Sequence, residues 1–149
     1  MRTSILVLAL FALPALAAER RSDIEFLNAP EAEKSGYPFS EAVRAGGTLW
    51  LSGQIGIDPA TGKLVEGGIE AEAKQTLDNI RATLERHGHA TTDVVKCTVM
   101  LADIAEWSRF NAVYKSFFAR PYPARSALGA NGLALGARVE VECIAWVGD

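Results

Sequence analysis

The pattern of apolar and polar positions predicts five strands. Residues 41–45 and 48–57 lie on either side of a Gly-Gly pair, which is typical of two antiparallel strands joined by a tight turn. Residues 93–103 and 137–147 alternate over longer stretches, so we expect two longer strands there. In the first of these we expect one fully apolar face, made of Val95, Cys97, Val99 and Leu101. A short strand is expected from Ser126, followed by a glycine-rich loop.

Two other segments have helical spacing. From Ile69 to Leu84 the apolar residues recur every three or four positions, and Gly88 is a natural stop. Asp103 and Glu106 open the second segment with capping-box spacing. The apolar positions are Ile69, Ala73, Leu77, Ile80 and Leu84 in the first helix, and Trp107, Phe110, Tyr114 and Phe117 in the second. We expect both sets to be core.

The expected order is strand, strand, helix, strand, helix, strand, strand. A helix that buries one face needs a sheet to pack against. The sequence therefore predicts a single α+β domain, with one sheet and both helices on one of its faces.

The last strand has two different faces. Alternation places Val139, Val141, Cys143, Ala145 and Val147 on an apolar face, which we expect to pack on the helices. The opposite face carries Glu140, Glu142, Ile144 and Trp146. Because the chain has no further element to cover two large apolar side chains, we expect another subunit there, with a cleft between subunits. An exposed face with a stray tryptophan is the alternative.

The N-terminus departs from this globular pattern. Residues 1–17 combine a basic start, a short apolar run and a small-residue Ala-Leu-Ala end, which predicts a cleavable signal peptide. The run is shorter than the ~20 residues of a spanning helix, although an uncleaved anchor is the alternative. We expect residues 18–149 to form the mature domain, periplasmic or secreted, with no stable membrane insertion after cleavage.

The composition of the chain argues against nucleic acids and metal ions as partners. The net charge is −3 and no basic block occurs, so we expect no nucleic-acid partner. His87 and His89 flank the expected helix end without nearby cysteines, so we expect no metal site. Cys97 and Cys143 lie in apolar strand patterns, and the sequence leaves open whether they form a disulfide or stay buried thiols.

Arg125, in YPARSALGA at 122–130, has no acidic residue close in sequence. Glu140 is a candidate partner, because a guanidinium binds carboxylates bidentately and a carboxylate can polarise a water molecule. Spacing alone favours a structural salt bridge over a site.

Seven ordered blocks resemble the Rid family (YjgF-like, reactive intermediate deaminases), over about residues 25–148. The blocks are PFSEAV at 38–43, LSGQIGIDPATGKLV at 51–65, QTLDNIRATLE at 75–85, VVKCTV at 94–99, FNAVYKSFF at 110–118, PARSAL at 123–128 and VEVECIA at 139–145. The resemblance implies a chorismate-mutase-like α+β fold and a homotrimer whose sheets line a central barrel, with active sites between subunits. It also implies hydrolysis of 2-imino acids to 2-oxo acids and ammonia without a cofactor or metal.

The resemblance also implies roles for particular residues. Arg125 would clamp the substrate carboxylate, aided by the backbone amide of Ala127, and Glu140 would orient the attacking water. Ser52 and Asn111 would line the pocket. The remaining position is Phe39, which aligns with a pocket tyrosine of the family and lacks its hydroxyl; Ala127 stands where cysteine is frequent.

A non-catalytic trimer of the same fold, binding a small carboxylate or acting as a chaperone, is the competing hypothesis. Arg125 and Glu140 together favour the enzyme, whereas the export signal adds weight to the alternative. Turnover would distinguish the two.

Overall fold

The computed structural model describes residues 23–30 and 36–148, so the predicted signal peptide lies outside the described residues. The main sheet contains β1 (Ile24–Leu27), β2 (Ala42–Ala45), β3 (Thr48–Leu51), β4 (Gln54–Ile55), β7 (Val94–Leu101), β8 (Ala124–Gly129) and β9 (Val139–Trp146). A separate pair is formed by β5 (Ile57–Asp58) and β6 (Lys63–Leu64). The helices are α3 (Gly68–Arg86) and α4 (Trp107–Phe117), with 3-10 turns η1 (Thr91–Asp93), η2 (Ile104–Glu106) and η3 (Ala134–Gly136).

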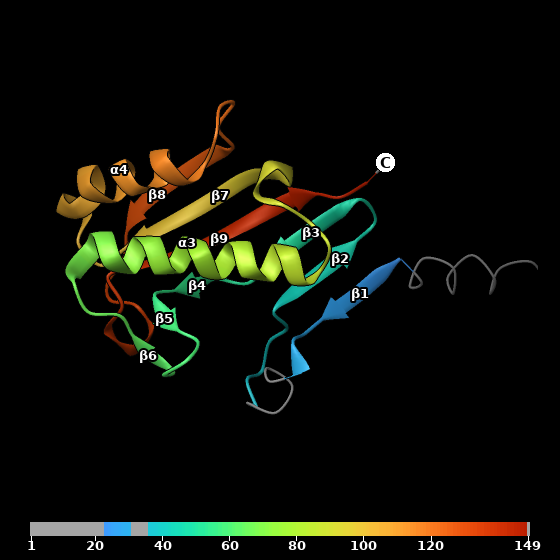
Figure 1. Ribbon diagram of the computed structural model, residues 1–149, viewed down its shortest axis with the longest axis horizontal. Coiled ribbons are helices and arrows are strands. Elements are labelled where there is room, and N and C mark those ends of the chain that lie inside the picture. The colour runs from blue at the N-terminus through green and yellow to red at the C-terminus, as the bar shows by residue number, and fades with distance from the viewer. Residues whose placement is uncertain (1–22, 31–35, 149) are drawn as a thin grey trace, which may run out of the picture.

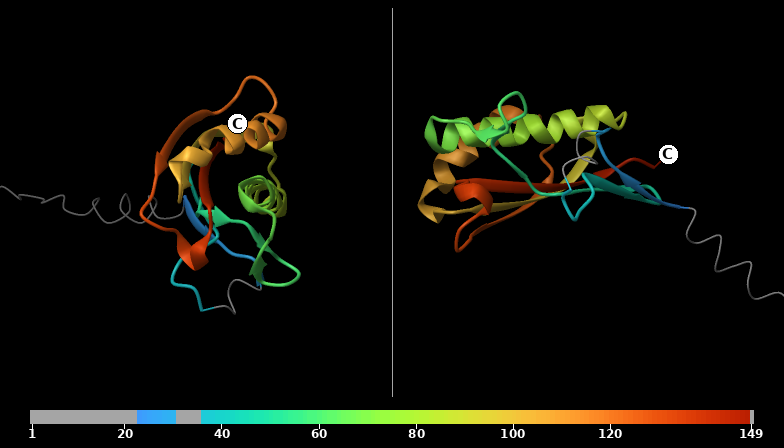
Figure 2. Two further views of the ribbon diagram at one scale, coloured as in Figure 1. Left: turned by 90° about the vertical axis from the view of Figure 1, so that its left-hand side faces the viewer. Right: turned by 90° about the horizontal axis from the view of Figure 1, so that it is seen from below.

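The strand order is β1-β2-β3-β9-β7-β8, with β4 also paired to β9. All these pairs are antiparallel except β7 with β8, whose connection runs through α4. Both helices lie on one side of the sheet (Figures 1 and 2). The predicted α+β class and the single helix-bearing face are therefore confirmed.

The core lies between the sheet and α3. All five apolar positions predicted for this helix are fully buried. Opposite them, Val139, Val141, Cys143 and Ala145 of β9 are at most 1% exposed. The predicted division of β9 into two faces is thus confirmed. Over residues 23–30 and 36–148, no helix is long and apolar enough to cross a bilayer.

The aromatic residues of α4 are only partly core. Phe110 and Tyr114 are buried, but Trp107 is 40% exposed, so its assignment to the core was wrong. Trp107 is the first residue of α4 and lines an open hollow beside Arg125, instead of packing into the core. The capping prediction is half correct, because Asp103 accepts a hydrogen bond from the Ala105 N–H at 2.9 Å while the Glu106 carboxylate instead accepts one from Arg138 at 2.7 Å.

Three strand predictions need correction. The segment 48–57 is not one strand, because the chain leaves β3 after Leu51 and pairs anew with β9 through β4. In β7, a register shift between Val94 and Lys96 leaves Val95 47% exposed and buries Val94 in its place. β8 begins at Ala124, before Ser126, and β1 was not predicted.

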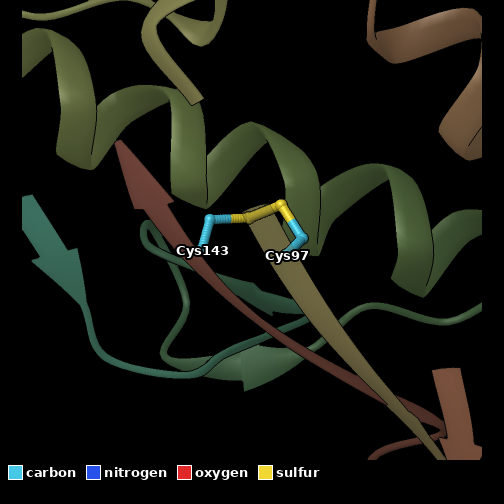
Figure 3. The surroundings of a disulfide bond; sticks show 2 residues. All are labelled: Cys97 and Cys143. Carbon is cyan, nitrogen blue, oxygen red and sulfur yellow. A yellow bond between two sulfur atoms is a disulfide. The ribbon is translucent and has the colours of Figure 1, made fainter. Parts of the chain in front are cut away.

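A disulfide joins the two central strands. Cys97 and Cys143 lie directly opposite each other in β7 and β9, with Cα atoms 4.1 Å apart. Both are buried, and Figure 3 shows the bridge on the side of the strands that faces α3. The question that the sequence left open is answered in favour of a disulfide.

Candidate active site in two halves

The sheet face away from the helices carries large apolar side chains, and no described element of the single chain covers it. Register places Phe26, Val43, Trp50 and Ile144 side by side across four strands. Trp50 is 51% exposed, and Trp146 on the same face is 55% exposed. This is the mixed face that the alternation of β9 predicted, and it also carries Glu140.

Arg125 lies on the other face, between β8 and α4. It pairs with Cys97 in β7, and paired residues point to the same side of a sheet, which here is the helix side. Its guanidinium carbon lies 4.5 Å from the centroid of the Tyr114 ring, 5.8 Å from that of Trp107 and 5.9 Å from that of Phe110. Contacts of this kind attract a cation to the ring faces.

Among the residues that the structure describes, the guanidinium of Arg125 has no anionic partner. It makes neither a side-chain hydrogen bond nor an ion pair with any of them, unlike the guanidinium groups of Arg109 and Arg138, which bind carboxylates. The aromatic rings therefore fix the position of the cation and leave its five N–H donors available for an anion.

An open hollow of about 490 Å³ adjoins this guanidinium. Its walls are Ile104, Trp107 and Ala127, so Arg125 is the one charged residue lining it. Asn111 follows Trp107 by one helical turn, which places both on the same side of α4. The structure thus brings Arg125 and Ala127 to one hollow, together with two residues that the sequence did not single out as a site. Asn111 lies one turn along α4 from Trp107 and is not among the residues that line the hollow.

Tyr114 is a packing surface in this region. Burial raises the pKa of Tyr114 to about 12, and the nearby positive charge of Arg125 opposes that rise. Its buried hydroxyl has no hydrogen-bond partner among the described residues. The phenol therefore stays neutral near physiological pH.

Glu140 belongs to a second region. Its carboxylate lies against Gly53, where a Cβ atom would come within 2.1 Å of Oε1. The neighbouring Ser52 hydroxyl donates a hydrogen bond to the Ser40 carbonyl at 2.6 Å. Phe39, next to Ser40, is exposed and stacks on Tyr37 with ring centroids 5.3 Å apart. Ser52 and Phe39 are thus connected to Glu140 through their chain neighbours Gly53 and Ser40, and we group the three as the second half of the candidate site.

The two halves do not meet within one chain. Met100 pairs with both Glu140 and Leu128, so these residues share the open face. Arg125 is three residues from Leu128, and an odd separation in a strand directs side chains to opposite faces. The structural salt bridge between Arg125 and Glu140 is therefore absent from the single chain.

Sequence reasoning missed three residues of these regions. Ile104 went unremarked and Trp107 was assigned to the core, although a tryptophan in the first turn of a helix is at the end where burial is least complete. Gly53 carried no signal beyond its place in the Ser-Gly-Gln motif.

Comparison with known proteins identifies the family. A family model described as endoribonuclease L-PSP matches residues 27–147. The 2-iminobutanoate/2-iminopropanoate deaminase of Bos taurus is 50% identical over 108 residues, covering 72% of this chain and 79% of that protein. The Homo sapiens protein of the same name is 45% identical, with the same 72% and 79% covered. The crystal structure of the YjgF gene product from E. coli matches with a TM-score of 0.72 at 35% identity, covering 80% of this chain and 93% of that one.

The matches define an α+β domain of the YjgF architecture, with one main sheet and two helices. The chain belongs to the Rid (YjgF-like) family, described as endoribonuclease L-PSP.

Proposed function

We propose that this protein is an imine deaminase, which hydrolyses 2-imino acids to 2-oxo acids and ammonia. Relatives that are 45–50% identical over 108 residues are named for this activity. The structural observation that carries the proposal is the Arg125 guanidinium, held among three aromatic rings without an anionic partner in the described residues. A 2-imino acid supplies the missing carboxylate.

Arg125 would bind that carboxylate through two parallel N–H donors, with the backbone N–H of Ala127 as a further donor. This orients the imine carbon, which is electrophilic because it adjoins the carboxylate, so the protein mainly positions substrate and water. The apolar side chain of the substrate would lie in the hollow against Ile104 and Trp107. Ser52, Asn111 and Phe39 remain predicted pocket residues.

Glu140 would hold the attacking water. The water oxygen bonds to the carbon of the nitrogen-protonated imine and gives a proton to the Glu140 carboxylate, while the C=N π electrons go to nitrogen. Glu140 then returns its proton to the nitrogen, the C–N bond breaks and ammonia leaves. The remaining hydroxyl loses its proton to give the 2-oxo acid, so every atom of the water is accounted for.

The proposed mechanism requires two copies of the chain. Arg125 and Glu140 point to opposite faces in one copy, so the proposed mechanism works only if Arg125 of one copy approaches Glu140 of another. The uncovered face with Trp50 and Trp146 supports such an assembly, because exposed apolar patches are common interface sites. We take the assembly to be a closed homotrimer, as the family resemblance implies.

We also propose that the protein is exported. The support is the signal-peptide pattern of residues 1–17 together with the disulfide between Cys97 and Cys143, since disulfides persist in oxidising compartments. Peptide mapping of the protein from its native host would show whether residues 1–17 are removed, and retention of Met1 would contradict the proposal.

The enzymatic test is an imine-trapping assay. An amino-acid oxidase generates 2-imino acids from alanine, 2-aminobutyrate and leucine, and semicarbazide traps whatever is not hydrolysed. Wild type should reduce the trapped fraction. Arg125→Ala should lose roughly 100-fold or more in kcat/KM, because it removes a charged bidentate contact. Arg125→Lys is the matched control. It keeps the positive charge but not the paired N–H donors of the guanidinium, so kcat/KM should fall less than in Arg125→Ala. Wild-type-like turnover in Arg125→Ala would contradict the carboxylate clamp.

A further inference from the structure

Gly53 occupies an unusual place beside Glu140. It lies between the end of β3 at Leu51 and the start of β4 at Gln54, where the chain changes its pairing. An added Cβ atom would come within 2.1 Å of Glu140 Oε1, 3.0 Å of its Cδ and 3.1 Å of its Cγ. The Glu140 carboxylate therefore fills the space that any side chain at position 53 would need.

Backbone conformation does not explain this glycine. Eight glycines of the chain have positive φ, including Gly46 and Gly62, and those positions favour glycine for conformational reasons. Gly53 is not among them. Its contacts also differ from those of Gly47, which meets the Trp146 ring, and of Gly56, which meets the backbone of Glu72. At Gly53 the three nearest atoms all belong to one carboxyl-bearing side chain.

The position of the Glu140 carboxylate depends on this contact with Gly53. Among the described residues the Glu140 carboxylate accepts no hydrogen bond and forms no ion pair, so no donor fixes its side-chain torsions there. The shape of the β3–β4 corner is left to set the position of its carboxylate. We propose that Gly53 is a positioning residue, which lets the Glu140 carboxylate lie against the backbone and thereby sets where it holds the attacking water. This inference rests on the proposed role of Glu140.

A methyl group at position 53 would displace Oε1 by on the order of 1 Å, and a misplacement of that size can cost about 100-fold in rate. The test is a kinetic cycle with Gly53→Ala, Glu140→Asp and the double variant, in the full chain. We expect Gly53→Ala to lower kcat by 10-fold or more while KM changes less than about 3-fold, because the Arg125 contact is untouched. In the Glu140→Asp background the shorter side chain withdraws from position 53, so Gly53→Ala should then cost less than about 3-fold.

Gly47→Ala is the matched control. It adds a methyl group that meets Trp146 at 2.8 Å in the same sheet, and its effect should be equal in the wild-type and Glu140→Asp backgrounds. The proposal is overturned if Gly53→Ala keeps kcat within 2-fold of wild type, or if its loss is the same in both Glu140 backgrounds.

Failure of the deaminase proposal gives a different result, because wild type would then turn over no imine. In that case crystal structures of wild type and Gly53→Ala test directly whether residue 53 sets the position of the Glu140 carboxylate. A Glu140 carboxylate that contacts Gly53 in wild type and moves by about 1 Å or more in the variant supports it; an unmoved carboxylate overturns it.

Discussion

The two faces of the sheet differ in how far the rest of the chain covers them. On the helix side, α3 and α4 bury β9 and β7 almost completely, and a disulfide joins the two strands there. On the opposite side the same strands present Glu140 and Trp146, and no described element covers them. One face packs the core of the chain, whereas the other is the face that we propose a second copy of the chain covers. The candidate site is divided in the same way, with Arg125 behind the sheet and Glu140 in front.

The largest expected effect tests this division by complementation. Arg125→Ala and Glu140→Gln should each lose about 100-fold or more in activity when they are assembled alone. Co-expressed in equal amounts with different tags, they should regain about a quarter of wild-type activity, because that fraction of randomly formed interfaces pairs two intact halves in a closed ring. Activity of the purified mixed assembly is the measurement. An active Glu140→Gln protein would mean that Glu140 has no role, and two inactive variants whose mixture restores nothing would mean that both groups act within one chain.

The second effect concerns the open face alone. Trp50→Lys places a charge at its centre, so we expect the assembly to dissociate and activity to fall with it, because a buried unpaired charge is costly. Far-UV circular dichroism should stay native, since Trp50 contributes nothing to the helix-side core. Light scattering gives the mass. Glu85→Lys, which adds the same side chain on the exposed face of α3, should keep the wild-type mass. A Trp50→Lys protein of unchanged mass would mean that the open face is not the interface.

The third effect concerns the covered face alone. Replacing Cys97 and Cys143 together by alanine removes a bridge that spans 46 positions of sequence. We expect the free energy of unfolding to fall by about 2–4 kcal/mol, as for other disulfides, while the mass stays constant. Denaturant titration measures this loss. Val99→Ala, a core truncation on the same strand, is the control that creates a cavity without removing a bridge. Unfolding that matches wild type would show that the bridge adds nothing to stability.

The smallest effect is a pH dependence inside the core. Tyr114 has a pKa of about 12 in the folded chain and about 10 when unfolded, so the unfolded state loses its proton first. The free energy of unfolding should therefore fall as pH rises from about 10 to about 12, by at most ~1.4 kcal/mol per unit. Tyr114→Phe should lack this part of the slope and should be no less stable at pH 7, because it removes an unpaired buried hydroxyl. Parallel pH profiles of the two proteins would contradict the assignment.

Local patterns were enough to predict the covered face. The spacing of Ile69 to Leu84 defined the buried side of α3, and alternation assigned Val141 and Glu140 to opposite sides of β9. Both results follow from periodicity within one element. The prediction that Val95 is buried was wrong because a register shift interrupts the periodicity of β7. No residue type in β7 signals that shift in the sequence.

Features that depend on pairing between distant strands could not be predicted. The disulfide forms because Cys97 lies opposite Cys143, and only the register of β7 against β9 establishes that. Arg125 was left outside the expected strand from Ser126, so its face could not be assigned. The pairing of β8 with β7 is what shows that Arg125 and Glu140 lie on opposite faces of the sheet.

The guanidinium of Arg125, unpaired among the described residues, also bears on how a product would leave this site. In the proposed mechanism Arg125 binds a carboxylate, and a 2-oxo acid has the same carboxylate as the 2-imino acid from which it forms. That contact cannot separate substrate from product, so discrimination falls to the carbon that changes from C=N to C=O. The 2-oxo product should therefore compete for the site, and the enzyme should slow as product accumulates wherever nothing removes it.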